Sequence, residues 1–171
     1  MYRKKKIEVI FQNASAGWIR FQIKVGKSVF NSHFSAVFDP IPDLKHWIEA
    51  ISLGVQQASF VYNSEGDFIK FNYSETQGEL LVLRQFLNKD KNLVVKKKEI
   101  FSISSEYSNE VYLETLISRK QLVETIYYGL LQFIEYEKEI AEKWHKHYKE
   151  SGCSNIYSFK SEIIENYLNN E

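Results

Sequence analysis

The chain has 171 residues, with 22 Lys and Arg against 22 Asp and Glu, a 44% apolar share and a 15% aromatic share. This composition excludes an extensively disordered chain, and one domain is the default at this length. The formal net charge of zero, with lysine far outnumbering arginine, disfavours nucleic acid and anionic membranes as partners. We therefore expect a single domain over residues 1–171.

The first residues are basic, but Glu8, Gln12 and Asn13 interrupt the apolar stretch that a signal peptide needs. No run of about 18 apolar residues, the length of a membrane span, occurs. Cys153 is the single cysteine, so neither an intrachain disulfide nor a Cys-based zinc site can form. These features favour a cytoplasmic protein of bacterial type without a cofactor.

The first half of the chain is predicted to consist mainly of strands, three of them before the first helix. Apolar and polar residues alternate over 18–25, and a Gly26-Lys27 turn leads into a strand over 29–38. That strand places on one face Phe30, Phe34, Ala36 and Phe38. Two prolines and Asp43 then predict a helix over 43–53, closed by Gly54.

The second half is predicted to hold five strands and two helices. The strands span 58–63, 67–74, 79–87, 93–103 and 110–117, with Gly66 in a bulged hairpin turn. The strand 79–87 is apolar on both faces and should lie centrally. A capping-box sequence at 118–121 starts a long helix that Ser151-Gly152 ends, and a short amphipathic helix spans 156–168.

Tight connections between successive strands require antiparallel pairing. The expected fold is therefore α+β, with an antiparallel, curved sheet of about seven to eight strands. A short helix is inserted after the third strand. The long C-terminal helix and the terminal helix pack on one face of the sheet.

The histidines do not have the spacing of a metal site. His145 and His147 are two apart on a helix and point in different directions, so they cannot share a metal. His33 lies on the strand face opposite the phenylalanines, and His46 lies on the polar side of the first helix. No metal ligand is predicted.

Other catalytic motifs are also missing. Glu65 and Asp67 flank a glycine in a turn, where both carboxylates are solvated. Catalysis by two carboxylates needs acids that face each other across a cleft, so this pair is not a candidate site. The sequence contains neither a glycine-rich phosphate loop nor a G-x-S-x-G elbow. We therefore predict no catalytic or cofactor-binding residue, and the sequence favours a protein that is not an enzyme.

Aromatic side chains are the compositional excess, and they are enriched at protein interfaces. Tyr127 and Tyr128 are adjacent in the long helix, so one should face the core and the other the solvent. Trp144 and Tyr148 form a pair one turn apart, and the lysine run around Lys97 is either a solvated strand edge or a partner-binding patch. The candidate protein interface therefore comprises Tyr128, Trp144, Tyr148 and Lys97.

The segment 38–51 (FDPIPDLKHWIEAI), followed by 64–67 (SEGD), resembles a pattern in small uncharacterised bacterial cytosolic proteins. Some of those proteins are similar to immunity proteins that neutralise polymorphic toxins. The shared positions are capping and core positions, so the resemblance implies a fold: a short helix before a strand hairpin, and a helix after the last strand. This chain lacks the strong acidity that would suit a basic nuclease toxin.

We therefore expect a non-enzymatic protein-binding domain, whose most concrete version is a toxin-neutralising immunity protein that acts by steric occlusion. Two other hypotheses stay open. One is a small-molecule-binding or enzymatic domain with a pocket between the sheet and the long helix. The other is a structural homodimer in which the C-terminal helix packs on a second copy.

Overall fold

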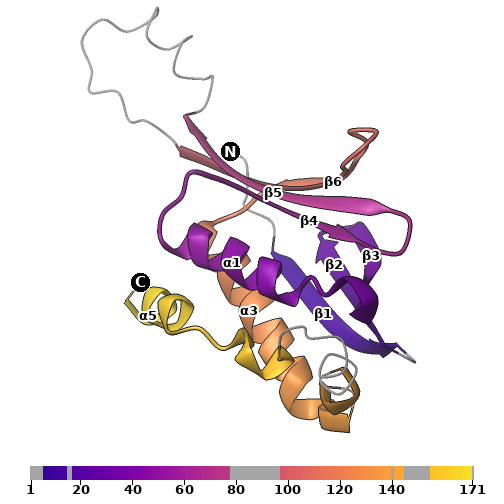
Figure 1. The fold of residues 1–171 in the computed structure, drawn as a ribbon. Coiled ribbons are helices and arrows are strands. Elements are labelled where there is room, and N and C mark those ends of the chain that lie inside the picture. The colour runs from indigo at the N-terminus through magenta and orange to yellow at the C-terminus, as the bar shows by residue number, and fades with distance from the viewer. Residues whose placement is uncertain (1–5, 15–16, 78–96, 140, 145–154, 171) are drawn as a thin grey trace, which may run out of the picture.

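The computed structural model describes residues 6–14, 17–77, 97–139, 141–144 and 155–170. Its first strands are β1 (Ile7–Ala14), β2 (Trp18–Val25) and β3 (Ser28–Ser35), and they precede the 3-10 turn η1 (Ala36–Phe38) and helix α1 (Ile41–Ser52). The next strands are β4 (Gln57–Asn63), β5 (Phe68–Gln77), β6 (Lys97–Ser105) and β7 (Val111–Leu116). The elements after them are α3 (Arg119–Tyr136), η2 (Ile156–Phe159) and α5 (Glu162–Asn170) (Figure 1).

Strands β1, β2 and β3 form a three-stranded antiparallel sheet in chain order. The alternation predicted for β2 is confirmed, because its inward side chains are buried and those between them are not. The turn after β2 depends on Gly26, whose φ of +61° costs glycine little.

The strand predicted over 29–38 is too long. The hydroxyl of Ser35 accepts a hydrogen bond from the backbone N–H of Val37, and the chain turns into η1. The strand period therefore ends after Phe34, which is buried, and Phe38 lies exposed instead of on the predicted face.

Strands β4 to β7 form a four-stranded antiparallel sheet, again in chain order. Gly66 has a positive φ, as predicted, and so does Glu65. The turn is nevertheless regular rather than bulged, because the backbone N–H of Ser64 donates to the Asp67 carbonyl and the pairing of β4 with β5 is continuous. The strand predicted over 79–87 lies outside the described residues.

The fold is α+β with antiparallel sheets, but the single curved sheet was a wrong prediction. Among the described residues, β3 has no backbone ladder to β4 or β7, since η1 and α1 carry the chain from one sheet to the other. The sheets meet through side chains instead. Phe21 and Phe34 contact Tyr62 edge to face, at 5.9 and 5.0 Å between ring centroids.

Helix α1 begins two residues before its predicted start. Asp39 caps it by accepting a hydrogen bond from the Ile41 N–H, and Gly54 ends it with a φ of +91°. The predicted apolar face of α1 is confirmed, because the following residues are all buried: Leu44, Trp47, Ile48 and Ile51.

The long helix is shorter than predicted. Ser118 caps α3 by accepting a hydrogen bond from Gln121 N–H, as the capping sequence indicates, but the helix ends at Tyr136. Glu137 leaves helical geometry, with φ −102° and ψ 48°, and residues 138–139 and 141–144 are helical again. The predicted terminal helix divides into η2 and α5, with buried Ser161 between them.

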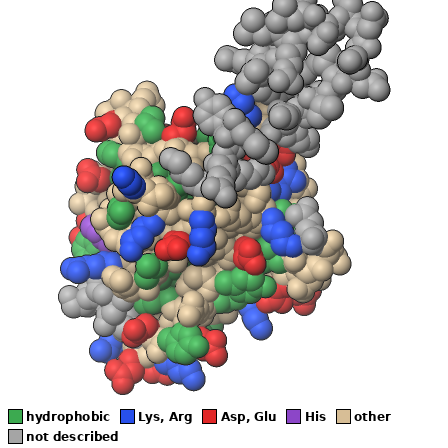
Figure 2. Space-filling model, turned by 180° about the vertical axis from the view of Figure 1, so that it is seen from behind, with side chains coloured by type: hydrophobic (Ala, Val, Ile, Leu, Met, Phe, Trp, Pro, Cys, Tyr) green, Lys and Arg blue, Asp and Glu red, His purple; other side chains and the backbone are tan. Residues whose placement is uncertain are grey.

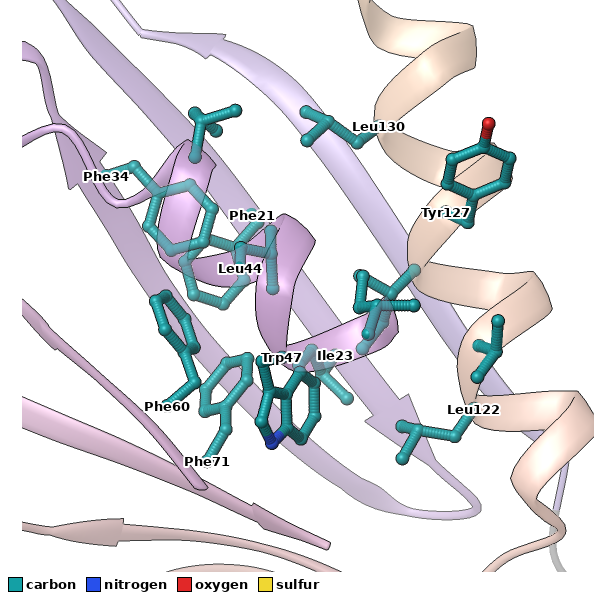
Figure 3. Close-up of a cluster of buried hydrophobic side chains, with 14 of the residues drawn as sticks. Phe21, Ile23, Phe34, Leu44, Trp47, Phe60, Phe71, Leu122, Tyr127 and Leu130 are labelled. Carbon is teal, nitrogen blue, oxygen red and sulfur yellow. The ribbon is translucent and has the colours of Figure 1, made fainter. Parts of the chain in front are cut away.

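Helix α1 lies between the four-stranded sheet and α3 (Figure 1). Its Trp47 contacts one ring from each of three strands: Phe60 of β4, Phe71 of β5 and Phe101 of β6, at 6.0 to 6.2 Å. On the other side, α1 contacts α3 and α5. The buried side chains of both sheets and the helices form one cluster, part of which Figure 3 shows.

Candidate functional site

Four polar side chains meet where α3 begins, and we call them the Arg119 cluster: Tyr73, Glu75, Glu99 and Arg119. The guanidinium of Arg119 donates to Glu75 Oε2 at 2.8 Å and to the Tyr73 hydroxyl at 3.3 Å. The backbone N–H of Arg119 donates to Glu99 Oε1 at 3.3 Å. The cluster therefore joins the first turn of α3 to β5 and β6.

Arg119 and Glu75 form an ion pair within this cluster. Burial raises the pKa of Tyr73, although its hydrogen bond with Arg119 acts in the opposite direction. Burial lowers the pKa of Arg119, but Tyr73 and Glu75 outweigh that effect and raise it above its ordinary value. At neutral pH the arginine is therefore charged and the tyrosine neutral. Because these groups are bonded to one another, the cluster holds the start of α3 to β5 and β6 and presents neither a free base nor a nucleophile.

A second polar network holds the C-terminal elements. Ser161 Oγ donates to Glu49 Oε1 of α1 at 2.6 Å, and Ser161 N–H donates to the Tyr127 hydroxyl at 3.0 Å. That hydroxyl in turn donates to Glu165 at 3.1 Å. Burial, as the largest cause, raises the pKa of Tyr127 to about 12. Each of these groups serves to attach η2 and α5 to α1 and α3.

Among the described residues, no three His, Cys, Asp or Glu side chains lie close enough together to bind one metal ion. His33 lies on the outer side of β3, with its ring 4.2 Å from that of Trp18, and His46 is exposed on α1. Residues His145 and His147 lie outside the described part of the chain. Glu65 is exposed in its turn and accepts a hydrogen bond from Ser35.

The four predicted interface residues do not form one surface in the described part of the chain. Tyr128 is 45% exposed, while its neighbour Tyr127 is buried, as the pairing predicted. Trp144 is only 1% exposed and belongs to the core, because 141–144 fold back against it, so it cannot serve as a surface anchor. Tyr148 lies outside the described residues. Lys97 starts β6 opposite Gln77 of β5, and its side chain is not among those described.

The four-stranded sheet has one face that no described element covers, and we call it the outer face. Alternation along each strand places there Ser59 and Val61 of β4, Lys70, Asn72 and Ser74 of β5, Ile100, Ser102 and Ser104 of β6, and Glu114 and Leu116 of β7. None of these side chains is buried. The described helices all lie on the opposite side of this sheet (Figure 1).

The middle of the outer face is flat because its side chains are short. Ser59, Asn72 and Ser102 lie side by side on successive strands, and Glu114 completes this row on β7. Ile100 and Leu116 form an apolar cross-strand pair beside that row. Seen from behind the molecule, charges of both signs are interspersed with apolar side chains over the described surface (Figure 2).

Sequence reasoning missed the Arg119 cluster because its members come from three elements with no shared motif. Arg119 was visible only as part of a capping sequence. The outer face had a signal: Lys70, Asn72 and Ser74 alternate with the apolar residues of β5, which is typical of a strand with one solvated face.

Among the described helices, none combines the length and the apolar character that crossing a bilayer requires. Searches of protein-family models, of curated proteins and of solved structures each find no match to this chain, so its function has to be argued from its own residues.

Proposed function

We propose that this chain is a non-enzymatic protein-binding domain that contacts its partner with the outer face of the four-stranded sheet. The observation that carries the proposal is the contrast between the two sides of that sheet. One side is filled by α1 and aromatic side chains, whereas the other has neither a described covering element nor a buried side chain.

The outer face suits a rigid contact. Backbone ladders hold its side chains in position, and Ser59, Asn72 and Ser102 have little conformational entropy to lose on binding. The apolar pair Ile100–Leu116 supplies an area whose burial would stabilise a complex. Such a surface can cover a partner's site without rearranging.

The most concrete version of this function is an immunity protein that neutralises a toxin by steric occlusion. The resemblance of 38–51 and 64–67 to proteins similar to immunity proteins favours it. The balanced charge argues for a toxin whose binding surface is not strongly basic.

The enzymatic alternative receives less support. The space between the sheet and α3, where a pocket was expected, holds α1 with Leu44 and Trp47 (Figure 3). The ionisable groups that come together in the described residues, around Arg119 and around Tyr127, are bonded to one another. A catalytic group needs a free position toward a substrate.

The test is co-purification with the toxin domain encoded by the neighbouring gene. Ser102→Arg places a large side chain in the middle of the outer face, and Ser28→Arg is the matched control at the exposed start of β3 in the other sheet. We expect the wild type and Ser28→Arg to bind and to protect cells from the toxin, and Ser102→Arg to fail in both while remaining folded. Binding by Ser102→Arg equal to the wild type would contradict the outer face. A neighbouring gene without a toxin would contradict the immunity version.

A further inference from the structure

Strand β4 presents a backbone edge that no described residue pairs with. The N–H of Ser64 donates to the Asp67 carbonyl, and the N–H of Glu75 donates to the Gln56 carbonyl. These two bonds fix which residues of β4 face β5: the even-numbered ones. The N–H and C=O groups of the odd-numbered ones therefore point to the open edge, at Gln57, Ser59, Val61 and Asn63.

The other margins of the two sheets are protected. Helix α3 lies so close to β1 that a Cβ on Gly129 would be 3.3 Å from the Val9 carbonyl oxygen. Strand β7 carries a register shift and lies beside β3, where Tyr112 stacks on Phe30 at 5.8 Å. Covering elements and irregular pairing are the devices that keep strand edges from joining other chains.

In the part of the chain that the structure describes, β4 has no second strand partner and no register shift. Its sequence, QASFVYN, has no charge and no proline, and its pairing with β5 is regular. Helix α1 contacts β4 from the inner face of the sheet, where Trp47 lies against rings of β4, β5 and β6. Seven uncharged residues therefore form an edge that is unpaired among the described residues.

We propose that this edge pairs with β4 of a second copy, antiparallel, about a two-fold axis beside Phe60. In that register Ser59 lies opposite the partner's Val61, and Gln57 lies opposite the partner's Asn63. Each of these pairs joins two residues whose backbone groups point outward, so each exchanges two backbone hydrogen bonds. The strand is thus complementary to itself.

A second copy fits this edge because no like charges meet across the axis and the amide side chains of Gln57 and Asn63 can bond to each other. Two exposed apolar residues immediately before β4 add to the contact. Leu53 is 70% exposed and Val55 is 42% exposed, and the same register carries Val55 to the partner's Glu65 in its hairpin turn. The pairing leaves the outer face free and extends it across both copies, so it goes beyond the proposed function.

The test is the oligomeric state of the full chain by sedimentation velocity over a wide concentration range. Val61→Lys places a charge at the axis, and Ser59→Pro removes an N–H that points away from β5 and so makes no bond within the chain. Ser102→Lys is the control, because Ser102 lies on the same face but on β6, which β5 separates from β4. We expect a dimer for the wild type and the control, and about a tenfold or larger increase in the dissociation constant for both edge variants.

Amide hydrogen exchange identifies the interface independently. We expect the N–H groups of Ser59 and Val61 to become more protected as the concentration rises, and circular dichroism to show both edge variants folded. A wild type that stays monomeric at every concentration overturns the proposal. So does a dimer that persists in both folded edge variants, or one lost only when 154–171 are deleted. A monomer that binds an extended peptide at β4 would also overturn it, since the occupant would then be another chain.

Discussion

The two faces of the four-stranded sheet are built from the same strands yet differ in almost every property. The inner face is aromatic and buried, and its residues include Phe60, Tyr62, Phe71, Tyr73 and Phe101. The outer face carries mainly serine, asparagine, lysine and glutamate, with a few aliphatic side chains, and none of the residues assigned to it above is buried. A period of two in the sequence thus separates the residues that build the scaffold from those available to a partner.

The inner face is specified by ring geometry as well as by burial. Phe71 contacts Trp47, Phe60 and Phe101 at 5.6 to 6.0 Å, and the planes of the phenylalanine pairs are nearly perpendicular. Edge-to-face arrangements of this kind add to the free energy of area burial. Ser59, Asn72 and Ser102 in the middle of the outer face make no ring contact, and the edge-to-face pair Phe68–Tyr107 lies at its margin. The side chains in the middle can therefore change without altering the core.

The largest predicted effect separates two neighbours on β5. Phe71→Ala removes a ring from the centre of the core and should lower the free energy of unfolding by about 3–5 kcal/mol. Asn72→Ala, on the outer face, should change it by less than about 0.5 kcal/mol. Denaturant unfolding of both variants measures the difference, and similar values for the two would break the comparison between the faces.

The next effect concerns the Arg119 cluster. Arg119→Met removes the ion pair with Glu75, whose side chain is only 7% exposed, and should cost about 1–3 kcal/mol. The double variant with Glu75→Gln should be less destabilised than the sum of the single variants, because the two side chains interact directly. Strictly additive unfolding free energies would show that the ion pair does not hold α3 to the sheet.

Tyr127→Phe should cost roughly 1 kcal/mol at neutral pH, because it removes the hydrogen bonds to Ser161 and Glu165. Its larger effect on the free energy of unfolding is expected at alkaline pH. The pKa of Tyr127 is raised to about 12 in the folded chain, whereas a tyrosine of the unfolded chain has a pKa of about 10. The contribution of Tyr127 to the free energy of unfolding is therefore complete below about pH 10. It is lost as the pH rises between these values.

The wild type should therefore lose stability between about pH 10 and pH 12, and Tyr127→Phe should lose less. Part of the decline should remain, since burial also raises the pKa of Tyr62. Midpoints of denaturant unfolding across this range provide the measurement. Parallel curves for the two proteins would contradict the assignment.

The smallest effect is expected at Tyr128, the exposed neighbour of Tyr127. Tyr128→Ala should change the free energy of unfolding by less than about 0.5 kcal/mol. It should weaken partner binding less than Ser102→Arg does, because α3 lies on the side of the four-stranded sheet opposite the outer face (Figure 1). A greater loss of binding than in Ser102→Arg would move the interface from the sheet to α3.

Local patterns in the sequence predicted the elements well and their ends less well. Alternation identified β2, and helical spacing with flanking caps identified α1 and the start of α3. The end of β3 was missed because the bond from Val37 N–H to the Ser35 hydroxyl stops the strand before the apolar pattern stops. The end of α3 was missed because the charged run 135–143 looks helical throughout, while Glu137 departs from helical geometry.

Long-range arrangement was the harder part. The division into two sheets depends on where η1 and α1 carry the chain, and no residue of β3 or β4 signals that they fail to pair. The Arg119 cluster depends on bringing Glu75, Glu99 and Arg119 together from separate elements. Trp144 was predicted at the surface from its spacing to Tyr148, and only the packing of the folded chain shows that it is buried.

A scan of β5 from Phe68 to Gln77, with stability and partner binding measured for each variant, tests the central claim most directly. We predict that the effects alternate. Substitutions at Ile69, Phe71 and Tyr73 should unfold the chain, and bulky ones at Asn72 and Ser74 should leave it folded but unable to bind. Outward substitutions that unfold the chain, or that leave both properties intact, would contradict the division of labour between the two faces.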